Sequence, residues 1–320
     1  MIVIAVATAA LAVVSLARLA VGSSGFGFAS DTAIADVRLA RVITSAIVGA
    51  ALALGGAMLQ SLLRNPLASP DLLGQSAGAG FAVMLITLIA HAFGVSVSNF
   101  SLAPVAVGGA LAALAVVYAA AQRRGMLDPP SLILVGVIVA LMCGAGTALV
   151  QHLLPPDPSR SHLRWLFGAI NDDATWMQIA AVGGVVIAAA ILGATLGPAL
   201  DAATLSDDEA LSMGVRLGSL RITLFVTSGI LAAGSVLLAG PIGFVGLICP
   251  HAVRLMAGPA HRPLMIASAL IGGTLLVGAD LAVAVVLTIW PELGRIPVGI
   301  LTALIGGPVF IAMLRRELRG

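Results

Sequence analysis

The sequence predicts an all-α protein that crosses a membrane many times, and three properties support this fold class. Only 9% of the 320 residues are charged and 60% are apolar, whereas a soluble domain carries about 25% charged residues. The mean hydropathy is +1.12. Apolar stretches of about 20 residues, the length that spans a bilayer as a helix, recur along the chain. These properties exclude a water-soluble enzyme and a nucleic-acid-binding protein.

Ten apolar stretches, delimited by glycines, prolines and charges, predict ten membrane-spanning helices. Their ranges are 1–20, 42–62, 71–92, 102–121, 131–154, 176–197, 222–240, 242–256, 263–289 and 297–314. The first stretch begins without a basic region and is followed by no small-residue cleavage site, which favours a retained helix over a signal peptide. The loops are too short for a soluble domain, so we expect residues 1–320 to form a single transmembrane domain.

The arginines indicate how the helices are oriented. In alternate loops, ten arginines fall on one side of the predicted membrane and five on the other. The richer side holds Arg64, Arg123, Arg124, Arg216, Arg221, Arg254, Arg262, Arg315, Arg316 and Arg319. The poorer side holds Arg38, Arg41, Arg160, Arg164 and Arg295. Because arginine-rich loops stay in the cytoplasm, both termini are predicted to be cytoplasmic.

Two further features of composition limit the chemistry of the chain. It contains no lysine, and a P-loop needs its lysine on the phosphates of the nucleotide. The chain therefore cannot hydrolyse ATP through a P-loop. Cys143 and Cys249 lie in apolar stretches and fit neither a disulfide framework nor a Cys-x-x-Cys metal site, so we interpret them as packing residues.

The eighth predicted span is interrupted by three glycines and two prolines within twelve residues. Irregular backbone at membrane depth is tolerated only where it is buried in protein or lines a cavity. The segment is therefore a candidate element of a translocation pathway. Its helix-interrupting residues are Gly240, Pro241, Gly243, Gly246 and Pro250.

A long polar stretch, residues 198–221, lies on the predicted cytoplasmic side. Ser206 and Glu209 match a capping box, and Gly214 suits the end of a helix. We expect a short amphipathic helix outside the membrane, with acidic side chains in its first turn, where the helix dipole favours them. This helix can lie on lipid or bind a partner protein, and its acidic character favours the partner because the inner leaflet is anionic. The acidic side chains are Asp207, Asp208 and Glu209, and the apolar ones are Leu205, Leu211 and Met213.

Arg38 and Arg41 precede the second span on the predicted outer side. Their three-residue spacing puts both guanidinium groups on one side of a helix. From the residues alone, an interfacial pair that reaches towards the lipid headgroups is the favoured interpretation.

These segments together resemble the iron-chelate (siderophore and haem) and vitamin B12 uptake permeases, the membrane subunits of type II ABC importers. The resemblance begins at Arg38-Leu39-Ala40-Arg41 and continues through Gly49–Ala53, Gln60 and the turn Asn65-Pro66-Leu67-Ala68-Ser69-Pro70. It covers nearly the whole chain in order. The later matching segments are 205–214, 240–251 with Arg254, His261-Arg262, Ala279-Asp280, 296–300 and 306–310.

The resemblance implies a ten-helix permease subunit that forms a homodimer around a central pathway. It implies two ATP-binding subunits on the cytoplasmic side and a substrate-binding protein on the outer side. The expected location is the bacterial cytoplasmic (inner) membrane, surrounded by membrane lipid. The chain is expected to be a transport subunit without an enzymatic site of its own, and without a cofactor, a bound metal or a nucleic-acid partner.

The resemblance also assigns roles to individual residues. Arg38 and Arg41 correspond to the family's outer arginines, which face glutamates on the two lobes of the binding protein, and this reverses the interpretation as lipid anchors. Ala284 stands where the family has a further arginine, and Arg295, in a longer loop, is the candidate replacement. Ala40 stands where a proline is usual. The expected cytoplasmic gate consists of Asn65, Leu67, Asp128 and Pro129. The expected ATPase-coupling residues are Ser206, Asp207, Asp208, Glu209, Leu211, Met213 and Gly214.

Within the family, the turn at residues 65–73 resembles the ferric-siderophore branch more than the vitamin branch, so a ferric siderophore is the preferred cargo. Haem and vitamin B12 stay open as alternatives. His152 and His162 are conceivable transient haem ligands, but solvated loop histidines are the favoured interpretation.

An ion-coupled secondary transporter is the alternative from another class, because ten helices also fit that class. Such carriers usually need ionisable groups at membrane depth, where Asp280 is the only plausible acid in this sequence. An intramembrane enzyme is a third option, but the spans contain neither a His-Glu-x-x-His motif nor a convincing Ser/His pair.

Overall fold

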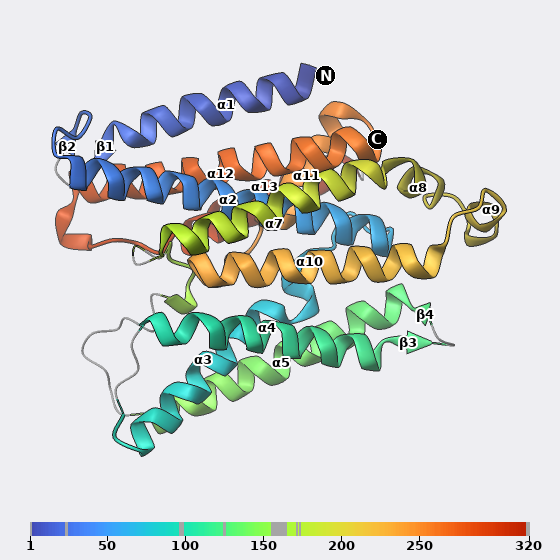
Figure 1. Ribbon diagram of the computed structural model, residues 1–320, viewed down its shortest axis with the longest axis horizontal. Coiled ribbons are helices and arrows are strands. Elements are labelled where there is room, and N and C mark those ends of the chain that lie inside the picture. The colour runs from blue at the N-terminus through green and yellow to red at the C-terminus, as the bar shows by residue number, and fades with distance from the viewer. Residues whose placement is uncertain are drawn as a thin grey trace.

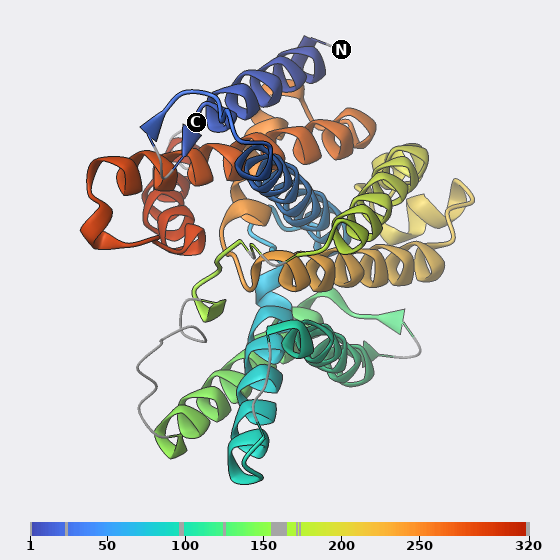
Figure 2. The same ribbon diagram turned by 60° about the vertical axis from the view of Figure 1, so that its left-hand side comes forward.

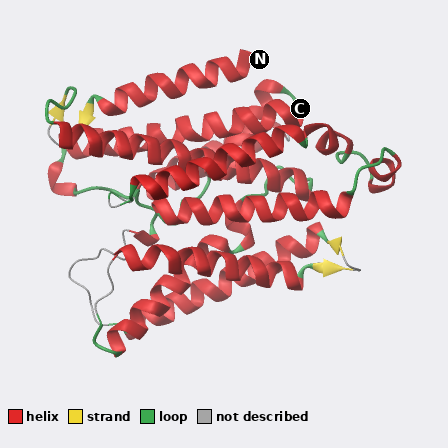
Figure 3. Cartoon of the chain, in the orientation of Figure 1, coloured by secondary structure: helices red, strands yellow, loops and turns green. Residues whose placement is uncertain are grey.

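The computed structural model describes residues 2–22, 25–95, 99–123, 126–154, 165–170, 172 and 174–317. The described chain is mostly α-helical, with two small antiparallel hairpins (Figure 1, Figure 3). The helices of the first half are α1 (Ile2–Leu19), α2 (Thr32–Leu63), α3 (Gln75–Ala92), α4 (Asn99–Ala120) and α5 (Pro129–Leu153). Those of the second half are α7 (Trp176–Thr195), α8 (Gly197–Ala202), α9 (Asp207–Ser212), α10 (Leu217–Ala239), α11 (Val245–Ala257), α12 (His261–Ile289) and α13 (Val298–Glu317).

The remaining elements are short connections between these helices. In one hairpin, β1 (Val21–Gly22) pairs with β2 (Gly25–Phe26), and in the other, β3 (Gln122–Arg123) pairs with β4 (Met126–Leu127). Single-turn 3₁₀ helices precede α3 and α13. They are η1 (Pro70–Leu73) and η2 (Pro291–Leu293).

Helix α2 is the centre of the bundle, and it packs against α12, α10, α11 and α7. Figure 2 shows these helices arranged around it. Helices α3, α4 and α5 form a second group, which Figure 1 shows below the first and which joins it mainly where α4 packs on α10. Most of α2 is buried, whereas α1 lies on the outside and exposes most of its side chains.

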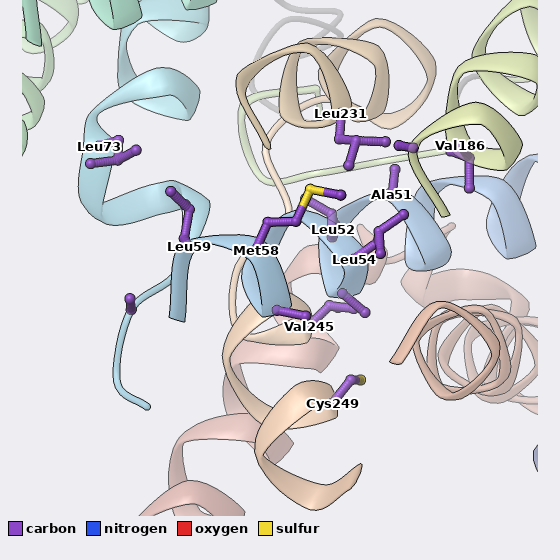
Figure 4. Packing of buried hydrophobic residues seen from close by; sticks show 14 of the residues in the cluster. Ala51, Leu52, Leu54, Met58, Leu59, Leu73, Val186, Leu231, Val245 and Cys249 are labelled. Atoms are coloured by element: carbon purple, nitrogen blue, oxygen red, sulfur yellow. The ribbon is translucent and has the colours of Figure 1, made fainter. Parts of the chain in front are cut away.

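A fully buried part of the core lies where α2, α10 and α11 meet. Figure 4 shows Leu54 and Met58 of α2 close to Leu231 of α10 and Val245 of α11. Cys249 is fully buried in the same cluster and is a free thiol. This agrees with its interpretation as a packing residue.

Glycine allows α2 to approach its neighbours closely. A Cβ at Gly49 would overlap the carbonyl oxygen of Gly272 in α12, and a Cβ at Gly56 would overlap that of Gly246 in α11. Small residues permit such close packing of membrane helices. At these two contacts, the glycines of α2 therefore serve tight bundle packing.

Each of the ten predicted spans overlaps a helix of the structure. Seven of the described helices are long and apolar enough to cross a membrane by length and composition. These are α1, α2, α3, α5, α7, α10 and α12. Shorter apolar helical segments are Pro104–Ala120, Val245–Ala257 and Val298–Ala312. The orientation of the termini stays a prediction.

The largest boundary error is at α2, which begins ten residues before its predicted start at residue 42. Asp31 caps this helix by accepting a hydrogen bond from the backbone N–H of Ala33. The charged residues of the first turns caused the error, because the prediction treated Arg38 and Arg41 as the boundary of the apolar span. Both arginines are instead buried inside the protein.

Candidate functional site

Near one end of α2 lies a partly buried group of charges, which we call the Arg41 charge cluster. It consists of Arg18, Arg41, Asp172, Asp280 and Arg295. Asp280 of α12 is its centre. The Nε of Arg18 donates to Asp280 Oδ2 over 2.6 Å, and the Nε of Arg41 donates to Asp280 Oδ1 over 2.8 Å. Helices α1, α2 and α12 are thus joined by two buried ion pairs.

The second acid of the cluster, Asp172, lies shortly before α7 and bridges two arginines. Its Oδ1 accepts a hydrogen bond from Arg41 Nη1, and its Oδ2 accepts one from Arg295 Nη1. Arg295 lies between η2 and α13, outside the predicted spans. Burial and the neighbouring charge of Arg41 lower the pKa of Arg295.

Arg38 is buried beside the cluster and has a different role in the structure. Its Nη1 donates to the carbonyl oxygens of Leu19 and Gly27, over 2.9 and 2.8 Å. It therefore fastens the first hairpin to α2. Arg38 and Arg41 are both buried and find acceptors within the chain, which does not fit an interfacial pair that reaches towards the lipid headgroups. Their docking role stays a prediction.

The sequence reasoning missed Arg18 and Asp172 as members of this cluster. The sequence did contain a signal for Arg18. An arginine at the end of one predicted span and an aspartate inside another, here Asp280, tend to form an ion pair in a membrane protein. Asp172 gave no such signal. Arg295 is the candidate replacement for the family arginine that is absent at Ala284. In the structure it lies near Arg41, because both arginines bind Asp172.

At the other end of the molecule, α8 and α9 project beyond the ends of the long helices (Figure 1). The predicted capping box is confirmed. Ser206 Oγ accepts from the backbone N–H of Glu209 over 3.2 Å, and Glu209 Oε2 accepts from the backbone N–H of Ser206 over 3.0 Å. The hydroxyl of Ser206 also donates to Glu209 Oε2 over 2.7 Å, and this bond, together with the one from the backbone N–H of Ser206, lowers the pKa of the Glu209 carboxyl. The helix ends before Gly214, which adopts a left-handed conformation with φ +83°.

Asp207 holds α9 against the membrane helices. It accepts hydrogen bonds from Arg64, at the end of α2, over 2.6 Å and from Arg221 of α10 over 2.8 Å. Burial acts to raise the pKa of Asp207, but the bonds from the two arginines outweigh it, so the pKa lies below its ordinary value. In addition, Asp201 of α8 accepts a hydrogen bond from the backbone N–H of His261 at the start of α12.

This segment also has exposed apolar side chains, which we call its apolar surface. Ala210 is buried against the bundle, whereas Leu205, Leu211 and Met213 are exposed. Asp208 is exposed as well. The segment is therefore held to α2 and α10 by the ion pairs of Asp207 and still exposes apolar side chains, which are available to another protein.

The expected gate residues lie at helix ends. Asn65 Oδ1 accepts a hydrogen bond from the backbone N–H of Leu67 over 2.9 Å, so the turn after α2 is closed by a side chain. Asp128 caps α5 by accepting from the backbone N–H of Ser131 over 3.1 Å, and Pro129 occupies the first turn of that helix. A gating role for these residues stays a prediction.

The interrupted eighth span has the irregular backbone that its sequence predicted. Helix α10 ends at Ala239, residues 240–244 are not helical, and α11 begins at Val245. Phe244 has φ +70°, a left-handed conformation that is rare outside glycine. Its ring lies next to Gly306 of α13. An apolar cavity of about 190 Å³ lies beside Phe244, between α11, α12 and α13.

Five residues named in the sequence analysis lie outside the described residues: Arg124, Arg160, His162, Arg164 and Arg319. His152 is exposed near the end of α5.

The sequence comparison decides the family. Residues 1–316 match the model of the FecCD transport family. This chain belongs to the FecCD family. The cobalamin import permease BtuC of Halobacterium salinarum is 38% identical over 89% of this chain and 74% of its own length. The Fe(3+)-citrate import permease YfmE of Bacillus subtilis is 36% identical over 92% of this chain and 85% of its own length.

A solved structure supports the same assignment. A metal-chelate type ABC transporter in an inward-facing conformation superimposes with a TM-score of 0.82 at 29% identity, over 98% of both chains. This FecCD protein is therefore the permease subunit of a type II ABC importer for an iron chelate, haem or vitamin B12. It is a multi-pass protein of the bacterial cytoplasmic (inner) membrane. Membership implies ATP-binding and substrate-binding partner proteins and favours this class over the secondary transporter.

The capping box provides a first prediction. Ser206→Ala should destabilise α9 locally by about 0.5–2 kcal/mol, because the backbone N–H of Glu209 loses its acceptor. Hydrogen exchange of residues 207–212 should become faster, whereas exchange in α10 should not change. Ser212→Ala is the matched control, since Ser212 only donates to the carbonyl of Glu209. Equal exchange in both variants would show that the box does not hold the helix.

Proposed function

We propose that this permease works as a homodimer that imports a ferric siderophore, driven by two separate ATP-binding subunits that bind residues 198–221. The observation that supports this best is the geometry of α9. Asp207 ties the helix to α2 and α10, while Leu211 and Met213 remain exposed. A rigid helix with an exposed apolar side can transmit movement between an ATPase and the membrane bundle.

The proposed path of the cargo runs along the irregular segment before α11 and leaves through a gate at Asn65, Leu67, Asp128 and Pro129. Ten spanning helices with both termini in the cytoplasm would place this gate and α9 on the same side as the ATPase. The Arg41 charge cluster would then face the outside, where the substrate-binding protein docks on Arg38, Arg41 and Arg295.

Reconstitution tests the energy source. The purified permease alone in liposomes should take up no cargo, and uptake should appear only with its ATP-binding subunits, its binding protein and ATP. The physical reason is that the chain lacks the lysine of a P-loop. Uptake driven by a proton or sodium gradient without any ATPase would contradict the proposal.

The cargo is tested in the same liposomes with ferric enterobactin, ferric citrate, haemin and cyanocobalamin. We expect uptake of a ferric siderophore. Import of cobalamin is the second candidate, because the 38% identical relative is a cobalamin import permease. Uptake of cyanocobalamin alone would show that the sequence of the turn at residues 65–73 does not identify the cargo.

A further inference from the structure

The buried position of Arg41 raises a steric problem for the proposed docking. Only 5% of the Arg41 side chain is exposed, and its guanidinium group already binds two carboxylates, those of Asp280 and Asp172. A carboxylate of a docking protein needs the same N–H groups. It can reach them only if one of the two resident carboxylates leaves.

The two resident acids differ in how firmly they are held. The Asp280 side chain is 1% exposed, lies in the middle of the long helix α12 and also binds Arg18. The Asp172 side chain is 42% exposed and lies outside the helices, and Arg295, its second partner, is 32% exposed. Exposed ion pairs are weak, whereas a buried acid shared by two arginines is costly to remove. Asp172 is therefore the acid that can leave.

We infer that Asp172 occupies the site of a partner's carboxylate, and that the substrate-binding protein docks by exchange. A glutamate or aspartate of that protein replaces Asp172 on Arg41 and Arg295. The inference rests on the proposed docking role of these arginines and adds the residue that competes for them.

The exchange also fits the charge of the cluster. Three arginines face two aspartates, so the cluster carries one excess positive charge while Asp172 is in place. Exchange replaces one carboxylate by another, and neither guanidinium group loses a partner at the end. The buried arginines are thus compensated both before and after docking, which makes the exchange reversible.

The test uses Asp172→Asn in the complete permease–ATPase complex, reconstituted in nanodiscs, and the binding protein encoded with this permease. Removing the competing charge should tighten binding of that protein about tenfold at low salt. Glu292→Gln is the matched control. Glu292 is exposed in η2, three residues before Arg295, and makes no ion pair with any described residue. Glu292→Gln changes the net charge by the same amount as Asp172→Asn, and it should shift the affinity for the binding protein less than twofold. Asp172→Glu should bind that protein as the wild type does.

A second measurement needs no partner protein. Phenylglyoxal modifies accessible arginines, and mass spectrometry locates the products. Modification of Arg41 and Arg295 should be several-fold faster in Asp172→Asn than in Glu292→Gln. Two results would overturn the exchange. One is an affinity of Asp172→Asn equal to that of Glu292→Gln. The other is an affinity of Asp172→Asn weaker than that of the wild type, in a complex whose melting temperature is unchanged.

One more variant separates this inference from the proposed docking itself. Arg295→Gln removes a partly exposed docking group without leaving a buried charge. If neither Arg295→Gln nor Asp172→Asn changes the affinity for the binding protein, the docking surface lies elsewhere. The proposed docking on these arginines is then wrong. If Arg295→Gln weakens binding while Asp172→Asn equals the Glu292→Gln control, docking stands and only the exchange fails.

Discussion

Replacing Asp280 by asparagine is expected to lower the free energy of unfolding by about 3–5 kcal/mol, the usual effect of removing one partner of a buried ion pair. Arg18 and Arg41 both donate to this carboxylate. Its neutralisation leaves the buried charge of Arg18 without a carboxylate and Arg41 with Asp172 alone, and it loosens α12 from α1 and α2. Thermal unfolding of the purified permease in detergent measures the effect.

Asp36→Asn is the control for this change. Asp36 is an exposed aspartate on α2, close in sequence to Arg38 and Arg41, and it makes no ion pair with any described residue. Its replacement should leave the melting temperature nearly unchanged. Adding Arg18→Gln to Asp280→Asn should recover part of the lost stability, because one uncompensated charge is then removed. Equal melting of Asp280→Asn and Asp36→Asn would show that the cluster does not stabilise the fold.

The second large effect is expected from Leu211→Asp, which should abolish ATP-driven uptake while the bundle still inserts. Leu211 is exposed on α9 and belongs to its apolar surface. Burying one leucine in an interface contributes about 1.5–3 kcal/mol, and a carboxylate in its place adds a desolvation cost. The affinity for the ATP-binding subunits should therefore fall by more than about tenfold, which corresponds to about 1.4 kcal/mol.

Co-purification of the ATP-binding subunits and uptake in liposomes are the two measurements. Ser212→Asp is the matched control, because it places the same charge on the neighbouring exposed residue of α9 but outside the apolar surface formed by Leu205, Leu211 and Met213. It should retain most of the uptake. If Leu211→Asp still co-purifies with the ATP-binding subunits and transports, α9 is not the coupling helix.

Features that depend on neighbouring residues could be predicted from the sequence. The helices follow from apolar stretches, and the capping box follows from Ser206 and Glu209. The interruption before α11 follows from Gly240, Pro241 and Gly243. In each case, the residues that determine the structure lie within a few positions of one another, so no knowledge of the tertiary fold is needed.

The Arg41 charge cluster could not be predicted in this way. Arg18 and Asp280 are 262 residues apart, and Arg41 and Asp172 are 131 residues apart. Their pairing depends on how α1, α2 and α12 pack. Without that knowledge, the sequence does not show that Arg38 and Arg41 are buried. In the structure, Arg41→Glu would place a carboxylate beside Asp172 and Asp280, so the fold itself would be affected.

The position of Asp172 in the chain has a mechanical consequence. It lies three residues before Thr175, which caps α7, and α7 runs through Leu196 into α8 and then to α9. With 20 residues, α7 is about 30 Å long at 1.5 Å per residue, and capping boxes at Thr175 and Ser206 stiffen both ends of this path. From Thr175 onwards, α7 and α8 therefore span the distance between the end of the molecule that holds Asp172 and the turn that leads to α9. A displacement beside the carboxylate that a docking protein would replace could thus be carried along these helices to the helix that an ATPase would contact.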